Sequence, residues 1–137
     1  MHASRQALNI LIADDDGTTR HVLRLLLREQ GHNVVAEAAD GEKAVELCLS
    51  HKPDLAFLDI DMPRLDGNQA AARIRQDDPR LGMIMISSVP TLIAVQHAMQ
   101  VGAGGFVVKP FNALKVAEAI ENCRKLRMPA SAKEVGE

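Results

Sequence analysis

Residues 8–16 have the sequence LNILIADDD, an apolar run that ends in three aspartates. A nearly continuous apolar run of this length is typical of a β-strand covered on both faces, as in a parallel sheet between two layers of helices. Similar short runs recur along the chain, each followed by a longer amphipathic stretch. We expect strands at residues 8–13, 33–38, 55–58, 83–86 and 106–108, and helices at residues 16–30, 68–76, 91–101 and 112–127, with a further helix capped by Asp40.

Five strand–helix units in series predict an α/β fold, with a doubly wound five-stranded parallel sheet and right-handed crossovers. The 137 residues suit one domain, and 47% hydrophobic with 25% charged residues is a balance that can bury a core without disulfides or metal. We expect the domain to cover residues 1–129. Residues 130–137, which are small and polar, are expected to form a flexible tail or the start of a linker.

Composition excludes several classes of protein. With 16 Lys and Arg against 18 Asp and Glu, the net charge of −2 disfavours direct binding to nucleic acid or an anionic membrane. Cys48 and Cys123 have no metal-ligand spacing and are expected to be buried. No apolar stretch approaches the length of about 18 residues that a membrane span needs, and the N-terminal run stops at aspartates, unlike a secretory signal. We therefore expect a cytoplasmic protein.

Polar residues follow four of the five expected strands: Asp14, Asp15 and Asp16 after the first, Asp59 and Asp61 after the third, Ser87 after the fourth and Lys109 after the fifth. The carboxyl ends of parallel strands share one edge, where ligands of such sheets bind. Carboxylates that converge there repel one another, and a divalent cation with oxygen ligands, above all Mg²⁺, relieves the repulsion. The sequence therefore predicts a magnesium site at this edge.

A metal ion, an ammonium group and a hydroxyl group around one point form a binding site for a tetrahedral dianion. Sites that transfer phosphoryl groups contain this set of groups. One carboxylate would then be the nucleophile and form an aspartyl phosphate. Asp59, at the end of the central strand, is best placed for this role. Asp16 and Asp40 are better explained as helix caps. Lys109 alone would suggest only a solvated strand end, so the prediction depends on the whole set.

Four motifs resemble the receiver domain of two-component response regulators, and the chain is similar to the single-domain chemotaxis regulators. The motifs are IADDD at residues 12–16, FLDIDMPRLDG at 57–67, MISS at 85–88 and GFVVKPF at 105–111. The resemblance covers residues 8–127. It implies a flavodoxin-like (βα)5 fold with strand order 2-1-3-4-5.

The resemblance also assigns roles in the site. Asp59 would be the phosphoacceptor, taking a phosphoryl group from a phosphohistidine of a sensor histidine kinase or a histidine phosphotransfer protein. Asp14, Asp15 and Asp59 would bind Mg²⁺ together with the backbone carbonyl of Asp61. Such a protein is a regulator rather than an enzyme, although it takes part in its own phosphorylation and dephosphorylation. Its output protein or effector domain is unknown, and it would be a monomer or a weak phosphorylation-linked dimer.

Ser87 and Lys109 would bind the phosphoryl oxygens, and the Lys109–Pro110 peptide bond is expected to be cis. The resemblance further implies a switch, in which Ser87 moves toward the phosphorylated aspartate and Phe106 turns inward. The face formed by the fourth helix, the fifth strand and the fifth helix would then be reshaped for a partner. Tyr is frequent in the family at the position of Phe106.

Two rival functions and one surface feature complete the interpretation. Asp59 and Asp61 also look like the nucleophile and general acid of a haloacid-dehalogenase-like phosphatase, but Pro63 stands where that motif wants Thr or Val. A pseudo-receiver that only binds partners is disfavoured by the retention of the complete set of site residues. Asp61 is hypothesised to alter the lifetime of the aspartyl phosphate. The stripe of Arg20, Arg24 and Arg28 is interpreted as a solvated helix face or, less simply, as a docking surface for an acidic kinase.

Overall fold

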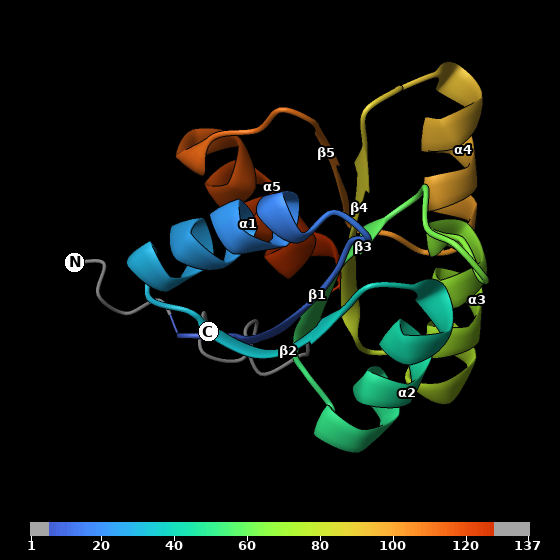
Figure 1. Ribbon diagram of the computed structural model, residues 1–137, viewed down its shortest axis with the longest axis horizontal. Helices are drawn as coiled ribbons and strands as arrows, with labels where there is room; N and C mark the ends of the chain where they lie inside the picture. The colour runs from blue at the N-terminus through green and yellow to red at the C-terminus, as the bar shows by residue number, and fades with distance from the viewer. Residues whose placement is uncertain (1–5, 128–137) are drawn as a thin grey trace.

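The computed structural model describes residues 6–127 and places a parallel sheet between two layers of helices (Figure 1). Its strands are β1 (Asn9–Ala13), β2 (Asn33–Ala38), β3 (Leu55–Asp59), β4 (Gly82–Ser87) and β5 (Gly105–Val108). Its helices are α1 (Gly17–Glu29), α2 (Gly41–His51), α3 (Gly67–Asp77), α4 (Leu92–Gln100) and α5 (Ala113–Arg127). Wherever the sequence predicts both ends of an element, the structure agrees to within one residue.

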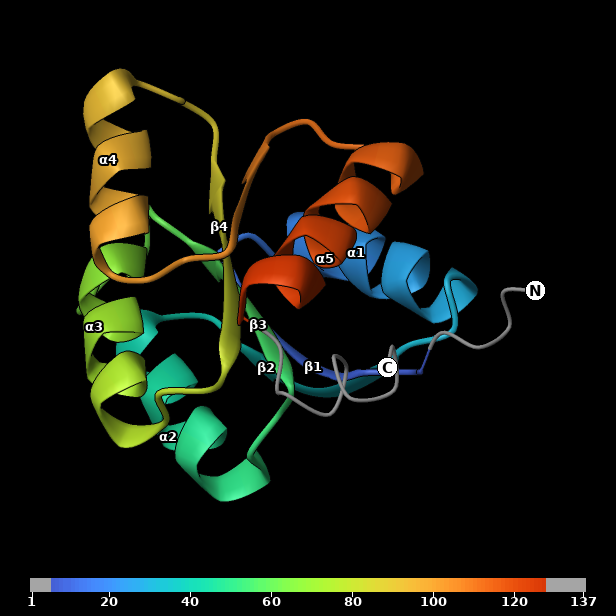
Figure 2. The same ribbon diagram turned by 180° about the vertical axis from the view of Figure 1, so that it is seen from behind.

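The strand order is β2-β1-β3-β4-β5, and all neighbouring strands are parallel. This confirms the predicted doubly wound architecture. The chain goes from β1 outward to β2 and then crosses back to β3 on the other side of β1. Helices α1 and α5 therefore cover one face of the sheet, and α2, α3 and α4 cover the other (Figures 1 and 2). The carboxyl ends of β1 and β3 meet where the strand order reverses, which is where ligands of open α/β sheets bind.

Two apolar clusters hold the helices to the sheet. Ile10 and Ile12 belong to the cluster under α1 and α5, and Leu11 and Ala13 belong to the cluster on the side of α2, α3 and α4. These four strand residues are fully buried, because successive side chains of a strand point to opposite faces and both faces are covered. Cys48 and Cys123 are both buried free thiols, as the sequence predicts.

Three aspartates near the carboxyl edge cap helices. The side chains of Asp16 and Asp40 accept hydrogen bonds from backbone N–H groups in the first turns of α1 and α2, which confirms their predicted roles. Asp66 forms a capping box with Gln69 at the start of α3. These carboxylates are committed to helix ends, so the residues left for chemistry are the other acids at this edge.

Two further predictions concern the C-terminal tail and the absence of a membrane-spanning helix. The predicted tail at residues 130–137 and the domain boundary at residue 129 lie outside the described residues. Within residues 6–127, every helix falls short of the combined length and apolar character that crossing a membrane requires.

Candidate functional site

Three carboxylates meet at the carboxyl edge of the sheet. Asp14 directly follows β1, Asp15 is the next residue, and Asp59 ends β3, the strand paired with β1. Each offers an oxygen, and these oxygens all lie within 4.8 Å of one another. Asp14 is 0% exposed and Asp59 is 2% exposed, whereas Asp15 faces solvent. Two of the negative charges are therefore held away from water, where they need compensation.

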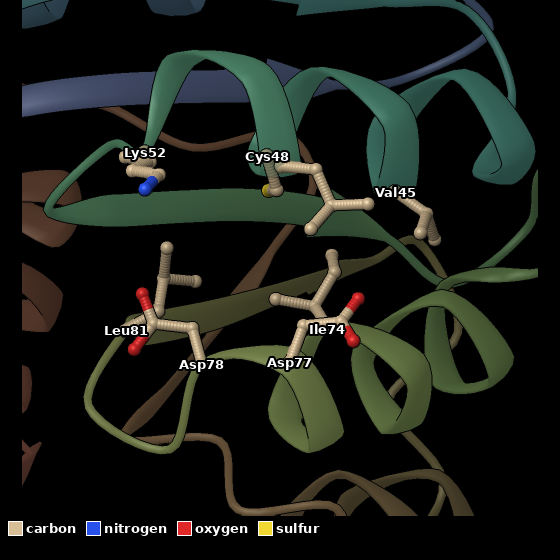
Figure 3. A pocket seen from close by; sticks show the side chains of 8 residues that line it. Val45, Cys48, Lys52, Ile74, Asp77, Asp78 and Leu81 are labelled. Carbon is tan, nitrogen blue, oxygen red and sulfur yellow. The ribbon is translucent and has the colours of Figure 1, made fainter.

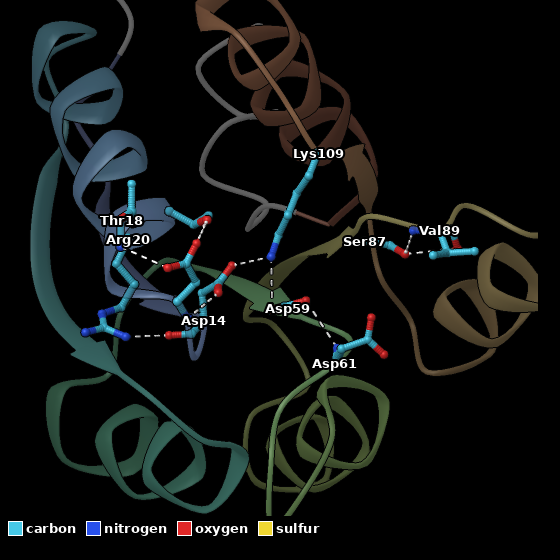
Figure 4. Close-up of polar contacts among 10 residues, drawn as sticks. Asp14, Thr18, Arg20, Asp59, Asp61, Ser87, Val89 and Lys109 are labelled. Carbon is cyan, nitrogen blue, oxygen red and sulfur yellow. Dashed lines mark hydrogen bonds and ion pairs between the residues drawn. The ribbon is translucent and has the colours of Figure 1, made fainter.

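Lys109 supplies this compensation from the end of β5. Its Nζ lies 2.9 Å from Asp14 Oδ2 and 3.1 Å from Asp59 Oδ2, so that one ammonium bridges the two buried carboxylates (Figure 4). The following peptide bond, Lys109–Pro110, is cis. The fold thus brings together the acids after β1 and β3 and the lysine after β5, three segments far apart in the sequence.

Burial and charge shift the protonation of this pair. Burial raises the pKa of Asp59, the charge of Asp14 adds to the effect, and the result is about 6 despite opposing hydrogen bonds from Asp61 and Lys109. Burial lowers the pKa of Lys109, but its hydrogen bonds to the two carboxylates outweigh that effect and leave the pKa above its ordinary value. The ammonium therefore stays charged, while Asp59 is a carboxylate whose negative charge is poorly tolerated until a further cation arrives.

The donor set fits a hard divalent cation. All three potential ligand groups are carboxylates, and oxygen ligands of this kind suit Mg²⁺, which is held by a few carboxylates and keeps several waters. Asp61 lies beside the site, where its backbone N–H donates to Asp59 Oδ1 at 3.1 Å and its side chain faces solvent. Its carbonyl remains a predicted ligand.

The two predicted switch residues lie on neighbouring strands, Ser87 at the carboxyl end of β4 and Phe106 near the start of β5. Ser87 is 2% exposed, and its hydroxyl exchanges two hydrogen bonds with the backbone of Val89: it accepts from the N–H at 3.0 Å and donates to the carbonyl at 3.1 Å. Phe106 is half-buried and packs against the core on the side of α2, α3 and α4. The side chain of Ser87 is thus directed into its own loop in this conformation (Figure 4).

The arginine stripe on α1 differs from its predicted role. Arg20 and Arg24 both form ion pairs with Glu37 of β2 and are half-buried, so the interpretation as a freely solvated stripe is wrong for these two residues, whereas Arg28 is exposed. The alternative role as a docking surface stays a prediction. Arg20 Nη1 also donates to the backbone carbonyl of Asp14 at 2.6 Å. The acidic residue in the expected strand at residues 33–38 is a signal that Glu37 has a basic partner, but it does not identify that partner as Arg20.

A small cavity of about 210 Å³ lies between α2 and α3, near the amino-terminal ends of β3 and β4 and hence at the opposite edge of the sheet from the acidic site (Figure 3). Burial raises the pKa of Cys48, which faces this cavity, to about 12, so the thiol stays protonated and unreactive. The cavity is separate from the acidic site, because none of the acidic-site residues lines it. It is lined by Val45, Cys48, Leu49, Lys52, Ile74, Asp77, Asp78 and Leu81.

Known proteins are similar to this chain in both sequence and fold. Residues 10–121 match the family model for the response regulator receiver domain. Chemotaxis protein CheY of Bacillus subtilis is 44% identical over 114 residues, which are 83% of this chain and 95% of that protein. Transcriptional regulatory protein PdtaR of Mycobacterium tuberculosis is 40% identical over 113 residues, 82% of this chain and 54% of that protein.

A solved structure gives the same result in three dimensions. The crystal structure of the CheX–CheY–BeF3–Mg²⁺ complex from Borrelia burgdorferi contains a chain that aligns with a TM-score of 0.79 and 35% identity, covering 82% of this chain and 85% of that one. The sequence match, the strand order and the acidic pocket agree. The protein belongs to the response regulator receiver domain family of two-component signalling.

Proposed function

We propose that this receiver domain accepts a phosphoryl group on Asp59 from the phosphohistidine of a sensor histidine kinase or a histidine phosphotransfer protein. The observation that carries the proposal is the bridge from Lys109 to both Asp14 and Asp59 within a cluster of three carboxylates. A carboxylate oxygen of Asp59 would attack phosphorus, so that a P–O bond forms while the P–N bond to the imidazole breaks. Catalysis of this transfer consists mainly of positioning and charge neutralisation.

Asp14, Asp15 and Asp59 are the residues that would hold Mg²⁺, with the carbonyl of Asp61 as a further ligand. When bound, the ion supplies positive charge that offsets both the carboxylates and the phosphoryl oxygens. The raised pKa of Asp59 supports this assignment, because it reports a buried negative charge with too little compensation from the protein alone.

Lys109 and Ser87 are the groups that would donate hydrogen bonds to the phosphoryl oxygens. The ammonium of Lys109 is already within 3.1 Å of the acceptor carboxylate, so a short movement suffices. The hydroxyl of Ser87 has to leave Val89 first, and Phe106 would turn inward as the loop after β4 moves. These movements would form the phosphorylation-dependent switch.

The output surface would be the face of α4, β5 and α5. Support comes from large apolar side chains that are exposed there, since such patches often mark binding sites. They are Val89 in the loop before α4, Leu92, Ile93 and Met99 of α4, and Val108 of β5. The partner would be a protein, either an output protein or effector domain or, weakly, a second phosphorylated copy. We propose that the chain itself binds neither nucleic acid nor membrane, and that it acts in the cytoplasm, where phosphohistidine donors are made.

The two rival functions are disfavoured on different grounds. Receiver domains are regulators and generally not classical enzymes, which removes support for the phosphatase that would use Asp59 and Asp61. The pseudo-receiver alternative is opposed by the presence of all the acidic and basic site residues in one pocket.

The test is phosphorylation by acetyl phosphate with and without Mg²⁺, followed by intact mass over time. Wild type should gain one phosphoryl group that requires Mg²⁺ and decays slowly, and Asp59→Asn should gain none. Asp54→Asn is the matched control, because it removes a carboxylate at the other end of β3 and should leave the adduct intact. Rapid turnover of acetyl phosphate would instead favour the phosphatase, and neither adduct nor turnover would favour the pseudo-receiver.

A further inference from the structure

The peptide group that joins Asp14 to Asp15 is held from outside the acidic pocket. Arg20 Nη1 donates to the Asp14 carbonyl at 2.6 Å. This carbonyl lies just beyond the last residue of β1, where the pairing with β3 has ended at Ala13 and Leu58. This peptide group joins the Cα atoms that carry the Asp14 and Asp15 side chains, so its orientation affects the position of both carboxylates.

The guanidinium is itself fixed by Glu37 of β2. Arg20 Nε lies 3.4 Å from Glu37 Oε1, while Arg24, one turn further along α1, pairs with the other oxygen of the same carboxylate. The adjacent residue of β2, Ala38, accepts a hydrogen bond from the Asp14 N–H at 3.0 Å. Both polar groups of the Asp14 backbone are therefore anchored, the N–H to β2 directly and the carbonyl to β2 through Arg20.

The orientation of the Asp14 carboxylate can be followed through a neighbouring contact. Asp14 Oδ1 accepts a hydrogen bond from the Asp16 N–H at 2.8 Å, and Oδ2 pairs with Lys109. A rotation of the Asp14–Asp15 peptide would disturb this arrangement. The Asp16 amide is thus a reporter of Asp14 that does not depend on any metal.

We propose that Arg20, held by Glu37, is a positioning residue that fixes the Asp14–Asp15 peptide and so presents both carboxylates to a divalent cation. This inference rests on the proposed function, because it concerns the metal site described there. Arg20 acts through Asp14 and has no direct part in phosphoryl transfer. Groups that orient metal ligands in this way contribute strongly to affinity even though they do not touch the ion.

Charge and positioning predict opposite effects of removing Arg20. By charge alone, Arg20→Gln removes a cation near the site and should strengthen Mg²⁺ binding. By positioning, the same substitution should weaken Mg²⁺ binding about 10-fold or more. The direction of the change therefore separates the two explanations.

The experiment is a Mg²⁺ titration of the full chain, followed by backbone amide shifts in NMR spectra. Arg24→Gln is the matched control: it makes the same change of charge, on the same helix, at the same Glu37 partner. Arg20→Gln should raise the Mg²⁺ dissociation constant about 10-fold, Arg24→Gln should leave it unchanged or slightly lower it, and Arg20→Lys should lie in between. An Arg20→Gln variant that binds Mg²⁺ as tightly as Arg24→Gln would overturn the inference.

A second measurement, made without Mg²⁺, tests positioning by Arg20 separately from the proposed metal site. Hydrogen exchange at the Asp16 amide should be faster in Arg20→Gln than in Arg24→Gln, at equal global stability measured by urea unfolding. Equal exchange would overturn positioning even if Mg²⁺ affinity changed. A wild type that binds no Mg²⁺ would contradict the proposed metal site itself, whatever the Asp16 amide shows.

Discussion

The hydroxyl of Ser87 and the backbone of Val89 are bound to each other in both directions, at 3.0 Å and 3.1 Å. A serine hydroxyl can donate only one hydrogen bond, and here the acceptor is the carbonyl of Val89. Any movement of Ser87 toward a phosphoryl group on Asp59 must break this pair and release the start of the loop that leads to α4. The pair therefore links the chemistry at β3 to the position of α4.

We predict that phosphorylation, or binding of the phosphoryl mimic beryllofluoride with Mg²⁺, shifts the Val89 amide signal in NMR spectra of wild type. In Ser87→Ala the amide should already be shifted before the ligand is added and should respond little afterwards. The Asp61 amide, which donates to Asp59, should respond in both proteins and so shows that the ligand has bound. A Val89 amide that does not respond in wild type would contradict this link.

The raised pKa of Asp59 predicts a pH-dependent gain in stability when its charge is removed. The pKa of Asp59 is about 6 in the folded state, against an ordinary value of 3.8. Between these two pH values the folded state binds more protons than the unfolded state. The free energy of unfolding therefore falls as pH rises through this range. In metal-free buffer, Asp59→Asn should raise the free energy of unfolding by about 1–3 kcal/mol at pH 8 and by much less at pH 4.

Urea unfolding at the two pH values measures this difference. Added Mg²⁺ is the internal control, because binding to the folded wild type stabilises it and should reduce the advantage of Asp59→Asn at pH 8. A variant that is less stable than wild type at pH 8 without metal would show that Lys109 compensates Asp59 fully.

The acidic pocket follows from the sequence because the carboxyl ends of parallel strands share an edge, so an apolar run that ends in acid already locates Asp14 and Asp59. The Arg20–Glu37 pair does not follow. The pairing of β1 with β2 shifts by one residue between Ile10 and Leu11, which places Glu37 opposite Ile12 instead of Ala13. A local strand pattern does not encode such a shift, since it depends on the packing of the assembled sheet.

Gly67 lies so close to Asp59 that a side chain there should disturb the acceptor. A Cβ at this position would lie 2.3 Å from the backbone oxygen of Asp59, and the backbone would have to move. Gly67→Ala should lower the free energy of unfolding by about 1–3 kcal/mol, as overpacking does, and should slow phosphorylation. Gly17→Ala is the control, because its Cβ would meet its nearest neighbour at 3.6 Å. Urea unfolding and intact mass measure the two effects, and equal behaviour of the two variants would contradict the prediction.

Asp61 should shorten the lifetime of the phosphorylated state. Its carboxylate faces solvent two residues after Asp59, and its backbone N–H donates to Asp59 Oδ1 at 3.1 Å, so the side chain is attached close to the acceptor. An exposed carboxylate there can accept a proton from the attacking water, and Asp61→Asn should therefore lengthen the lifetime about 3- to 10-fold, below the full range of general base catalysis because the group is solvated. The substitution keeps the backbone donor, so phosphorylation by acetyl phosphate should proceed as in wild type. The decay of the phosphorylated mass after removal of the donor measures the effect, with Asp54→Asn as the control. An unchanged decay in Asp61→Asn would assign hydrolysis to groups other than this carboxylate.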